Sequence, residues 1–130
     1  MSAVPKIYLT PAEYLAFERQ SDVKHEYFRG EIFAMSGASR QHVRISVNVT
    51  TLLDNQLKGR RCELFNSDMR VRVRPTGLYT YPDASIVCGR PRFEDEELDI
   101  LLNPKAIVEI LSKSTEAYDC GEKFAQYRTL

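Results

Sequence analysis

Residues 106–111, with the sequence AIVEIL, are apolar at every position except one. A strand that is apolar on both faces is typical of the middle of a sheet that is covered on both sides. The exception is Glu109, whose carboxylate needs a cation, a hydrogen-bond donor or a solvent-filled pocket in such a place. An ion pair with an arginine such as Arg70 or Arg72 is the structural alternative to a functional site.

The chain has 130 residues, which is the size of one domain, and its 43% hydrophobic and 28% charged residues are typical of a globular protein. Its 18 basic and 18 acidic side chains cancel, so a nucleic-acid contact must depend on local patches. The apolar runs are far shorter than the roughly 20 residues of a membrane-spanning helix, and the first residues lack a secretory signal. We therefore expect a cytoplasmic protein with no membrane partner and no organic cofactor.

The chain contains three cysteines, Cys62, Cys88 and Cys120. Their odd number and wide spacing fit neither a disulfide framework nor a CxxC zinc site. We expect reduced thiols.

Turn and capping signals divide the chain into a series of short elements. A helix over residues 11–20 begins at a capping box of Thr10 and Glu13, and a hairpin in residues 25–35 turns at Gly30. Length favours a helix over a strand for residues 43–57, although the pattern fits both, and Ser39 can cap the start of this helix. Further strands are expected at residues 62–65, 69–74, 80–88 and 106–111. A last helix begins at a capping box of Asp119 and Glu122, and the pattern runs to the final residue, so we expect the C-terminal part of the fold to be missing.

Asp83 is a second carboxylate in an unusual position, because it follows Pro82 and opens an apolar strand. A proline followed by aspartate often marks only a turn. Asp83 and Glu109 are 26 positions apart, each on a predicted strand, and they lie side by side if those strands are neighbours. Two such carboxylates can hold a hard divalent cation through oxygen.

Several groups of residues together resemble the Uma2 family of predicted endonucleases, which belong to the PD-(D/E)xK, restriction-endonuclease-like class. The groups that carry the likeness are Tyr81-Pro82-Asp83, residues 107–112 with Ser114-Thr115, Tyr118-Asp119, residues 121–124 and Tyr127-Arg128. Upstream, the likeness extends to the Tyr14-Leu15 helix, His25-Glu26-Tyr27, Gly30-Glu31, residues 35–37 and His42. It covers nearly the whole chain.

The resemblance implies an α/β core in which a mixed sheet is flanked by helices, and a metal-dependent endonuclease that hydrolyses DNA. It implies that Asp83 and Glu109 bind Mg²⁺ or Mn²⁺, and that the products carry a 5′-phosphate and a 3′-hydroxyl. Leu111 stands where the simple motif has its lysine, and Lys123 from the following helix is the match in this family. Glu26 and His42 are further site residues by the same likeness.

Arg70, Arg72 and Arg74 alternate along residues 69–74 and are the candidate phosphate contacts, together with Lys58, Arg60 and Arg61. An ion-paired or solvated sheet surface is the alternative for the three strand arginines. A module that binds nucleic acid or protein without catalysis is the alternative to an enzyme. A homodimer would suit the cutting of two strands.

Overall fold

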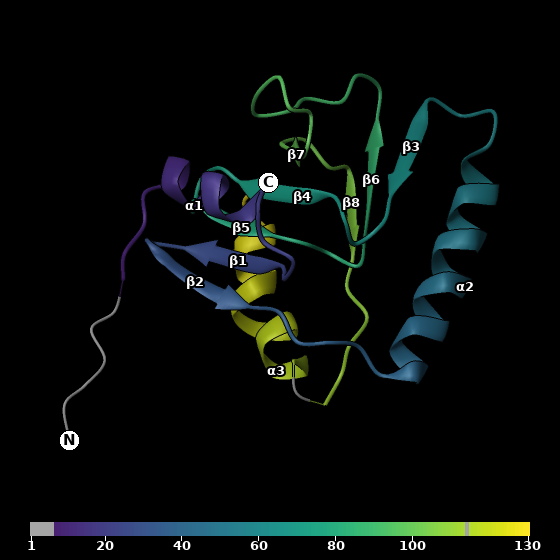
Figure 1. Ribbon diagram of the computed structural model, residues 1–130. Coiled ribbons are helices and arrows are strands. Elements are labelled where there is room, and N and C mark those ends of the chain that lie inside the picture. Colours follow the sequence, from purple (N-terminus) through teal and green to yellow (C-terminus); the bar gives the residue numbers. More distant parts are fainter. Residues whose placement is uncertain (1–6, 114) are drawn as a thin grey trace.

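The computed structural model describes residues 7–113 and 115–130 and has a mixed α/β fold with two sheets and flanking helices (Figure 1). In the described part of the chain, the larger sheet contains β1 (His25–Phe28), β2 (Glu31–Ala34), β4 (Arg70–Val73), β5 (Leu78–Thr80) and β7 (Ile100–Leu101). The smaller sheet contains β3 (Cys62–Phe65), β6 (Ala84–Cys88) and β8 (Ala106–Val108). The helical segments are α1 (Pro11–Glu18), α2 (Arg40–Leu57), α3 (Glu116–Tyr118), the π-helical η1 (Asp119–Lys123) and α4 (Phe124–Tyr127). The predicted fold class is confirmed.

The larger sheet has the order β2-β1-β5-β4-β7 and is mixed, because only its β4–β7 pair is parallel. Side chains alternate between the faces of a strand. On one face Tyr27 and Tyr79 pack against Tyr14 of α1, with the Tyr14 and Tyr27 rings 4.8 Å apart. Glu26 therefore belongs to the opposite face, where it meets Lys123 of the last helix.

The smaller sheet has the order β3-β6-β8, and α2 lies beside β3 (Figure 1). The sequence predicted a central strand for residues 106–111, and this prediction was wrong. Within the described residues β6 is central and β8 forms an edge. β8 ends at Val108 because the backbone N–H of Ile110 donates to the side chain of Asp83 and not to a neighbouring strand.

The helix starts predicted near the N-terminus are confirmed. Thr10 and Glu13 form the capping box of α1, and the Ser39 hydroxyl accepts the N–H of His42 at the start of α2. Gly59 follows α2 with φ +78°, a conformation that costs a residue without a Cβ little. Within residues 7–113 and 115–130, none of the helices is long and apolar enough for a membrane crossing.

Two predicted boundaries were wrong. Residues 80–88 form two strands instead of one, because Pro82 lacks an N–H and the chain leaves the larger sheet after Thr80 before it enters the smaller sheet at Ala84. The last helix begins at Glu116, so Asp119 lies inside it and forms no capping box. The sequence pattern did not predict the two-residue strand β7.

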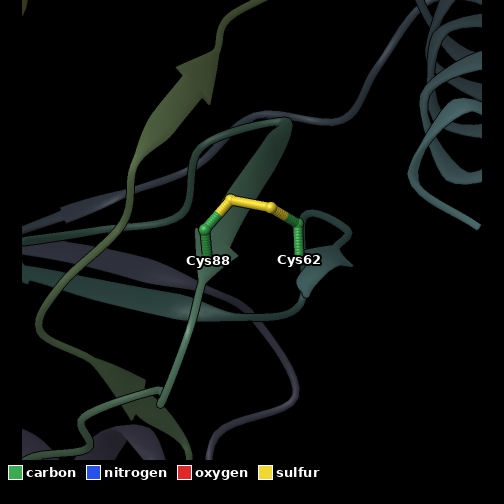
Figure 2. The surroundings of a disulfide bond; sticks show 2 residues. All are labelled: Cys62 and Cys88. Atoms are coloured by element: carbon green, nitrogen blue, oxygen red, sulfur yellow. A yellow bond between two sulfur atoms is a disulfide. The ribbon is translucent and has the colours of Figure 1, made fainter. Parts of the chain in front are cut away.

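The expectation of three reduced thiols was also wrong. Cys62 and Cys88 stand directly opposite each other on the antiparallel strands β3 and β6, and they form a disulfide (Figure 2). The spacing of the two cysteines in the sequence did not predict this bond, because strand register alone brings their Cα atoms to 4.0 Å. Cys120 is free and exposed.

Candidate active site

Asp83 and Glu109 come together at the neighbouring ends of β6 and β8. Ala84 pairs with Val108 in the antiparallel ladder, so the next pair outward is Asp83 and Glu109. The Asp83 carboxylate is fixed, since its Oδ2 accepts the N–H of Ile110 at 2.6 Å. The sequence proposed that these two carboxylates are neighbours if their strands are neighbours, and the strands are.

Lys123 reaches the same place from the last helix. Its side chain is only 3% exposed, and its Nζ lies 2.9 Å from Oε1 of Glu109 and 3.2 Å from Oε1 of Glu26. Asp119 is farther, with 3.9 Å between its Oδ1 and Nζ. The partner of Glu109 is thus this lysine, and the alternative of an ion pair with Arg70 or Arg72 was wrong.

The electrostatics of the pair follow from burial and proximity. Burial acts to lower the pKa of Lys123, but the carboxylates of Glu109 and Glu26 outweigh it and hold that pKa above its ordinary value. Burial raises the pKa of Glu109, and the Lys123 ammonium and the Tyr127 hydroxyl oppose the rise. The site therefore holds a buried cation that is stabilised by two carboxylates.

Two tyrosines complete the arrangement around these carboxylates. The hydroxyl of Tyr118 donates to Oε2 of Glu26 at 2.9 Å, and the hydroxyl of Tyr127 donates to Oε1 of Glu109 at 2.7 Å. Burial raises the pKa of each tyrosine, so each hydroxyl keeps its proton and stays a donor.

His42 lies on the first turn of α2 and faces Asp83. Its Nε2 is 3.4 Å from Oδ1 of Asp83, and its backbone N–H donates to the hydroxyl of Ser39. The imidazole ring of His42 is thereby directed at Asp83.

A cavity of about 970 Å³ contains all five of these residues, Glu26, His42, Asp83, Glu109 and Lys123. Phe28, Phe33 and Met35 give it an apolar wall, and Ser36 to Ser39 line its border near the start of α2. The five residues come from strand β1, from the ends of β6 and β8, and from two helices, which are far apart in the sequence.

The three strand arginines lie elsewhere. Arg70 is 6% exposed, and its Nε donates to the hydroxyl of Tyr81 at 2.9 Å. Arg72 forms an ion pair with Glu94, and Arg74 is exposed at the end of β4. Arg70 and Arg72 thus match the ion-paired sheet surface that the sequence left open.

The donor set suits a hard divalent cation. Among the described residues no group of three or more His, Cys, Asp and Glu side chains is arranged around a common metal position. Mg²⁺, however, is usually held by one or two carboxylates, with water and substrate phosphates as its other ligands. Asp83 and Glu109 meet this requirement with oxygen donors at adjacent strand ends.

A family comparison decides the kinship of the chain. The family model of Uma2, described as "Putative restriction endonuclease", matches residues 11–130. The chain belongs to the Uma2 family. This result confirms the resemblance seen in the sequence.

Relatives and a solved structure agree with this assignment. The chain is 46% identical over 119 residues to uncharacterized protein slr1290 of Synechocystis sp. strain PCC 6803, with 92% of this chain and 62% of that protein covered. It is 39% identical over 122 residues to uncharacterized protein sll1609 of the same organism, with 94% and 69% covered. It shares the fold of a crystal structure described as a putative nuclease belonging to DUF820 from Anabaena variabilis, at TM-score 0.72, 20% identity, and coverage of 90% of this chain and 66% of that one.

The sequence did not identify Tyr118, Asp119 and Tyr127 as site residues, although they belong to the Uma2-like motifs. Tyr127 stands four positions after Lys123, and Asp119 four positions before it, so a common helix face was a usable signal. Ser114, another residue of these motifs, lies outside the described residues.

Proposed function

We propose that this Uma2-family chain is a metal-dependent endonuclease that hydrolyses phosphodiester bonds of DNA and leaves a 5′-phosphate and a 3′-hydroxyl. The observation that carries the proposal is the convergence of Asp83, Glu109 and Lys123 in one cavity. The description of the family as a restriction endonuclease supports the same reaction. The chain spans 62% of the length of slr1290. The activity of the whole protein is therefore a proposal as well.

Asp83 and Glu109 would hold Mg²⁺ or Mn²⁺, which when bound polarises the phosphodiester and lowers the pKa of a water molecule. The backbone N–H of Ile110 keeps Asp83 in place for this role. Glu109 is oriented by Tyr127 and Lys123, which contact its Oε1.

Lys123 supplies a fixed positive charge next to the carboxylate pair. Its Nζ is 2.9 Å from Glu109, beside the place where a phosphate approaches, and there it offsets the negative charge that builds up on the phosphate during attack. Glu26 is a positioning residue, because it holds Nζ at 3.2 Å and is itself held by Tyr118.

His42 is a positioning residue for the other carboxylate, because its Nε2 lies 3.4 Å from Oδ1 of Asp83. Arg74, which is exposed, is the strand arginine that remains available for a phosphate.

Cleavage of supercoiled plasmid at low salt tests the proposal. We expect nicking with Mg²⁺ or Mn²⁺ and none with EDTA. Asp83→Asn and Glu109→Gln keep the side-chain volumes but remove a charge at the cation, so each should slow nicking by about 100-fold or more.

Glu13→Gln is the matched control, because it removes an exposed carboxylate at the start of α1 outside the cavity, keeps a side chain that can form the capping box, and should nick like the wild type. Nicking that survives in Asp83→Asn and Glu109→Gln would contradict the proposed roles. A folded wild-type chain that neither nicks DNA nor binds a divalent cation by calorimetry would leave the non-catalytic binding module as the better description.

A further inference from the structure

Six cationic side chains gather at the end of the smaller sheet that lies opposite to the candidate active site. We call them the cationic patch: Lys58, Arg60, Arg61, Arg90, Arg92 and Lys105, all exposed. They come from the loop between α2 and β3, the loop that follows β6, and the position before β8. In Figure 1 both loops lie at the top of the view, where they start from the neighbouring ends of β3 and β6, whereas α3 and the start of α2 lie at the bottom.

The backbone that carries the patch is tied together at several points. The Cys62–Cys88 disulfide joins the strand ends, and the N–H of Gly89 donates to the carbonyl of Arg61 at 2.8 Å (Figure 2). The Asn103 side chain accepts the N–H of Arg92 at 2.7 Å and donates to the carbonyl of Arg90 at 3.1 Å. The cations are therefore presented on a preorganised frame and not on loose loops.

Lys105 joins the patch through the same sheet. Its N–H donates to the carbonyl of Ile86, so it stands on the edge strand beside the far half of β6. The patch thus extends across all three strands.

The patch is not neutralised by the ion pairs of the described residues. The loop after β6 also carries acids. Glu94 pairs with Arg72, Asp95 and Asp99 pair with Arg19, and the exposed Glu96 and Glu97 follow Asp95 directly. These contacts hold the acidic half of the loop against α1 and β4, away from the patch. Asp54 and Glu63 flank the loop between α2 and β3 in the sequence and still leave an excess of cations. In a chain of zero net charge, this excess is a local feature.

The structure assigns the cationic patch as a binding surface for the phosphate backbone of duplex DNA, separate from the catalytic cavity. This inference rests on the proposed function, because it takes DNA as the substrate. β6 has 5 residues, so Asp83 and the disulfide end are about 17 Å apart at the usual rise of a strand. Successive phosphates of one DNA strand are about 3.4 Å apart along the axis of the duplex. The patch would therefore contact backbone about five base-pair steps, or half a helical turn, from the phosphate that is cut.

The test is fluorescence anisotropy with a short labelled duplex of random sequence, in EDTA so that no cleavage occurs, at salt from about 50 to 200 mM. The variants are Arg60→Gln/Arg61→Gln and Arg90→Gln/Arg92→Gln. The matched control is Arg29→Gln/Arg128→Gln, which removes two exposed arginines outside the patch and the cavity. Thermal melting checks that all three pairs are folded.

Each lost phosphate contact lowers the slope of log affinity against log salt by about 0.9. We expect a slope reduced by about 1 to 2 in each patch variant, a several-fold weaker affinity at low salt, and an unchanged slope in the control. Equal losses in the patch variants and the control, or no loss in any variant, would overturn the inference. A protein that never cleaves plasmid but shows patch-dependent binding would refute the proposed function and leave the surface standing.

Discussion

At the scale of single residues, Lys123 is the side chain on which the site depends most. Its ammonium is almost completely buried, yet its pKa stays above the ordinary value because Glu109 and Glu26 surround it. Removal of one partner from a buried ion pair is costly, because the other charges stay buried without compensation. The same geometry that would place a positive charge beside a phosphate therefore also stabilises the fold.

Lys123→Met should lower the free energy of unfolding by about 3–5 kcal/mol, because two buried carboxylates lose their cation. Urea denaturation measures this loss. The exposed Lys113→Met is the matched control and should change stability by less than about 0.5 kcal/mol. Addition of Glu26→Gln to Lys123→Met removes one orphaned charge and should restore part of the stability. A double variant as unstable as the sum of its single variants would contradict this account.

At the scale of elements, the last helix reaches the site through its π-helical turn. Tyr118 and Lys123 are five residues apart, and in a regular α-helix such residues point about 140° away from each other. η1 widens the turn between them, so that both contact Glu26. The last helix thereby contacts two carboxylates of the cavity, Glu26 and Glu109, since Tyr127 contacts Glu109.

Arg19, at the end of α1, connects this helix to the acidic loop before β7. It donates to Asp99 and Asp95, and the hydrogen bond from Arg19 holds the pKa of Asp99 below its ordinary value. A lowered pKa stabilises the fold above the unfolded-state pKa of about 3.9, and this stabilisation is lost as the pH falls through the folded pKa.

Arg19→Gln should therefore destabilise the protein at pH 7 and flatten the fall in stability below about pH 4. The loss should stay below about 1 kcal/mol, because the partners are more than a third exposed and solvent screens the pair. Thermal melting of both proteins between pH 7 and pH 2 measures it. An identical pH dependence in the two proteins would show that the pair contributes nothing to stability.

At the scale of the whole molecule, two sheets meet at the segment that holds Pro82. The larger sheet supplies Glu26, the ends of two strands of the smaller sheet supply Asp83 and Glu109, and α2 and the last helix supply His42 and Lys123. The disulfide lies at the far end of the smaller sheet, where it ties β3 to β6. Asp83 and Glu109 of the candidate site thus lie at one end of the smaller sheet, and the cationic patch lies at the other.

Cys62→Ser/Cys88→Ser should lower the free energy of unfolding by about 3 kcal/mol, because the bond closes a loop with a sequence separation of 26 residues in the unfolded chain. Chemical denaturation with and without a reductant measures this. The exposed Cys120→Ser is the control and should leave the transition unchanged. If the reductant left the wild-type midpoint unaltered, the proposed contribution of the disulfide would be refuted.

Local signals predicted the parts of this protein that depend on local physics. The capping box at Thr10, the turn at Gly30 and the Ser39 start of α2 depend on residues within four positions of one another, and all are confirmed. Asp83 and Glu109 were found for a related reason, because a carboxylate in an apolar strand is unusual whatever surrounds it.

Strand register and burial decided the rest, since they depend on contacts between residues far apart in the chain. Register alone placed Cys62 opposite Cys88, and the hydrogen bond from Ile110 to the Asp83 side chain ended β8 at Val108. Packing alone buried Lys123 against Glu26 and Glu109 and turned Arg70 and Arg72 into structural residues. The sequence by itself determined the family, the fold class and the two carboxylates, whereas the tertiary structure decided which cation faces them, because an ion pair forms only where folding brings its partners within reach.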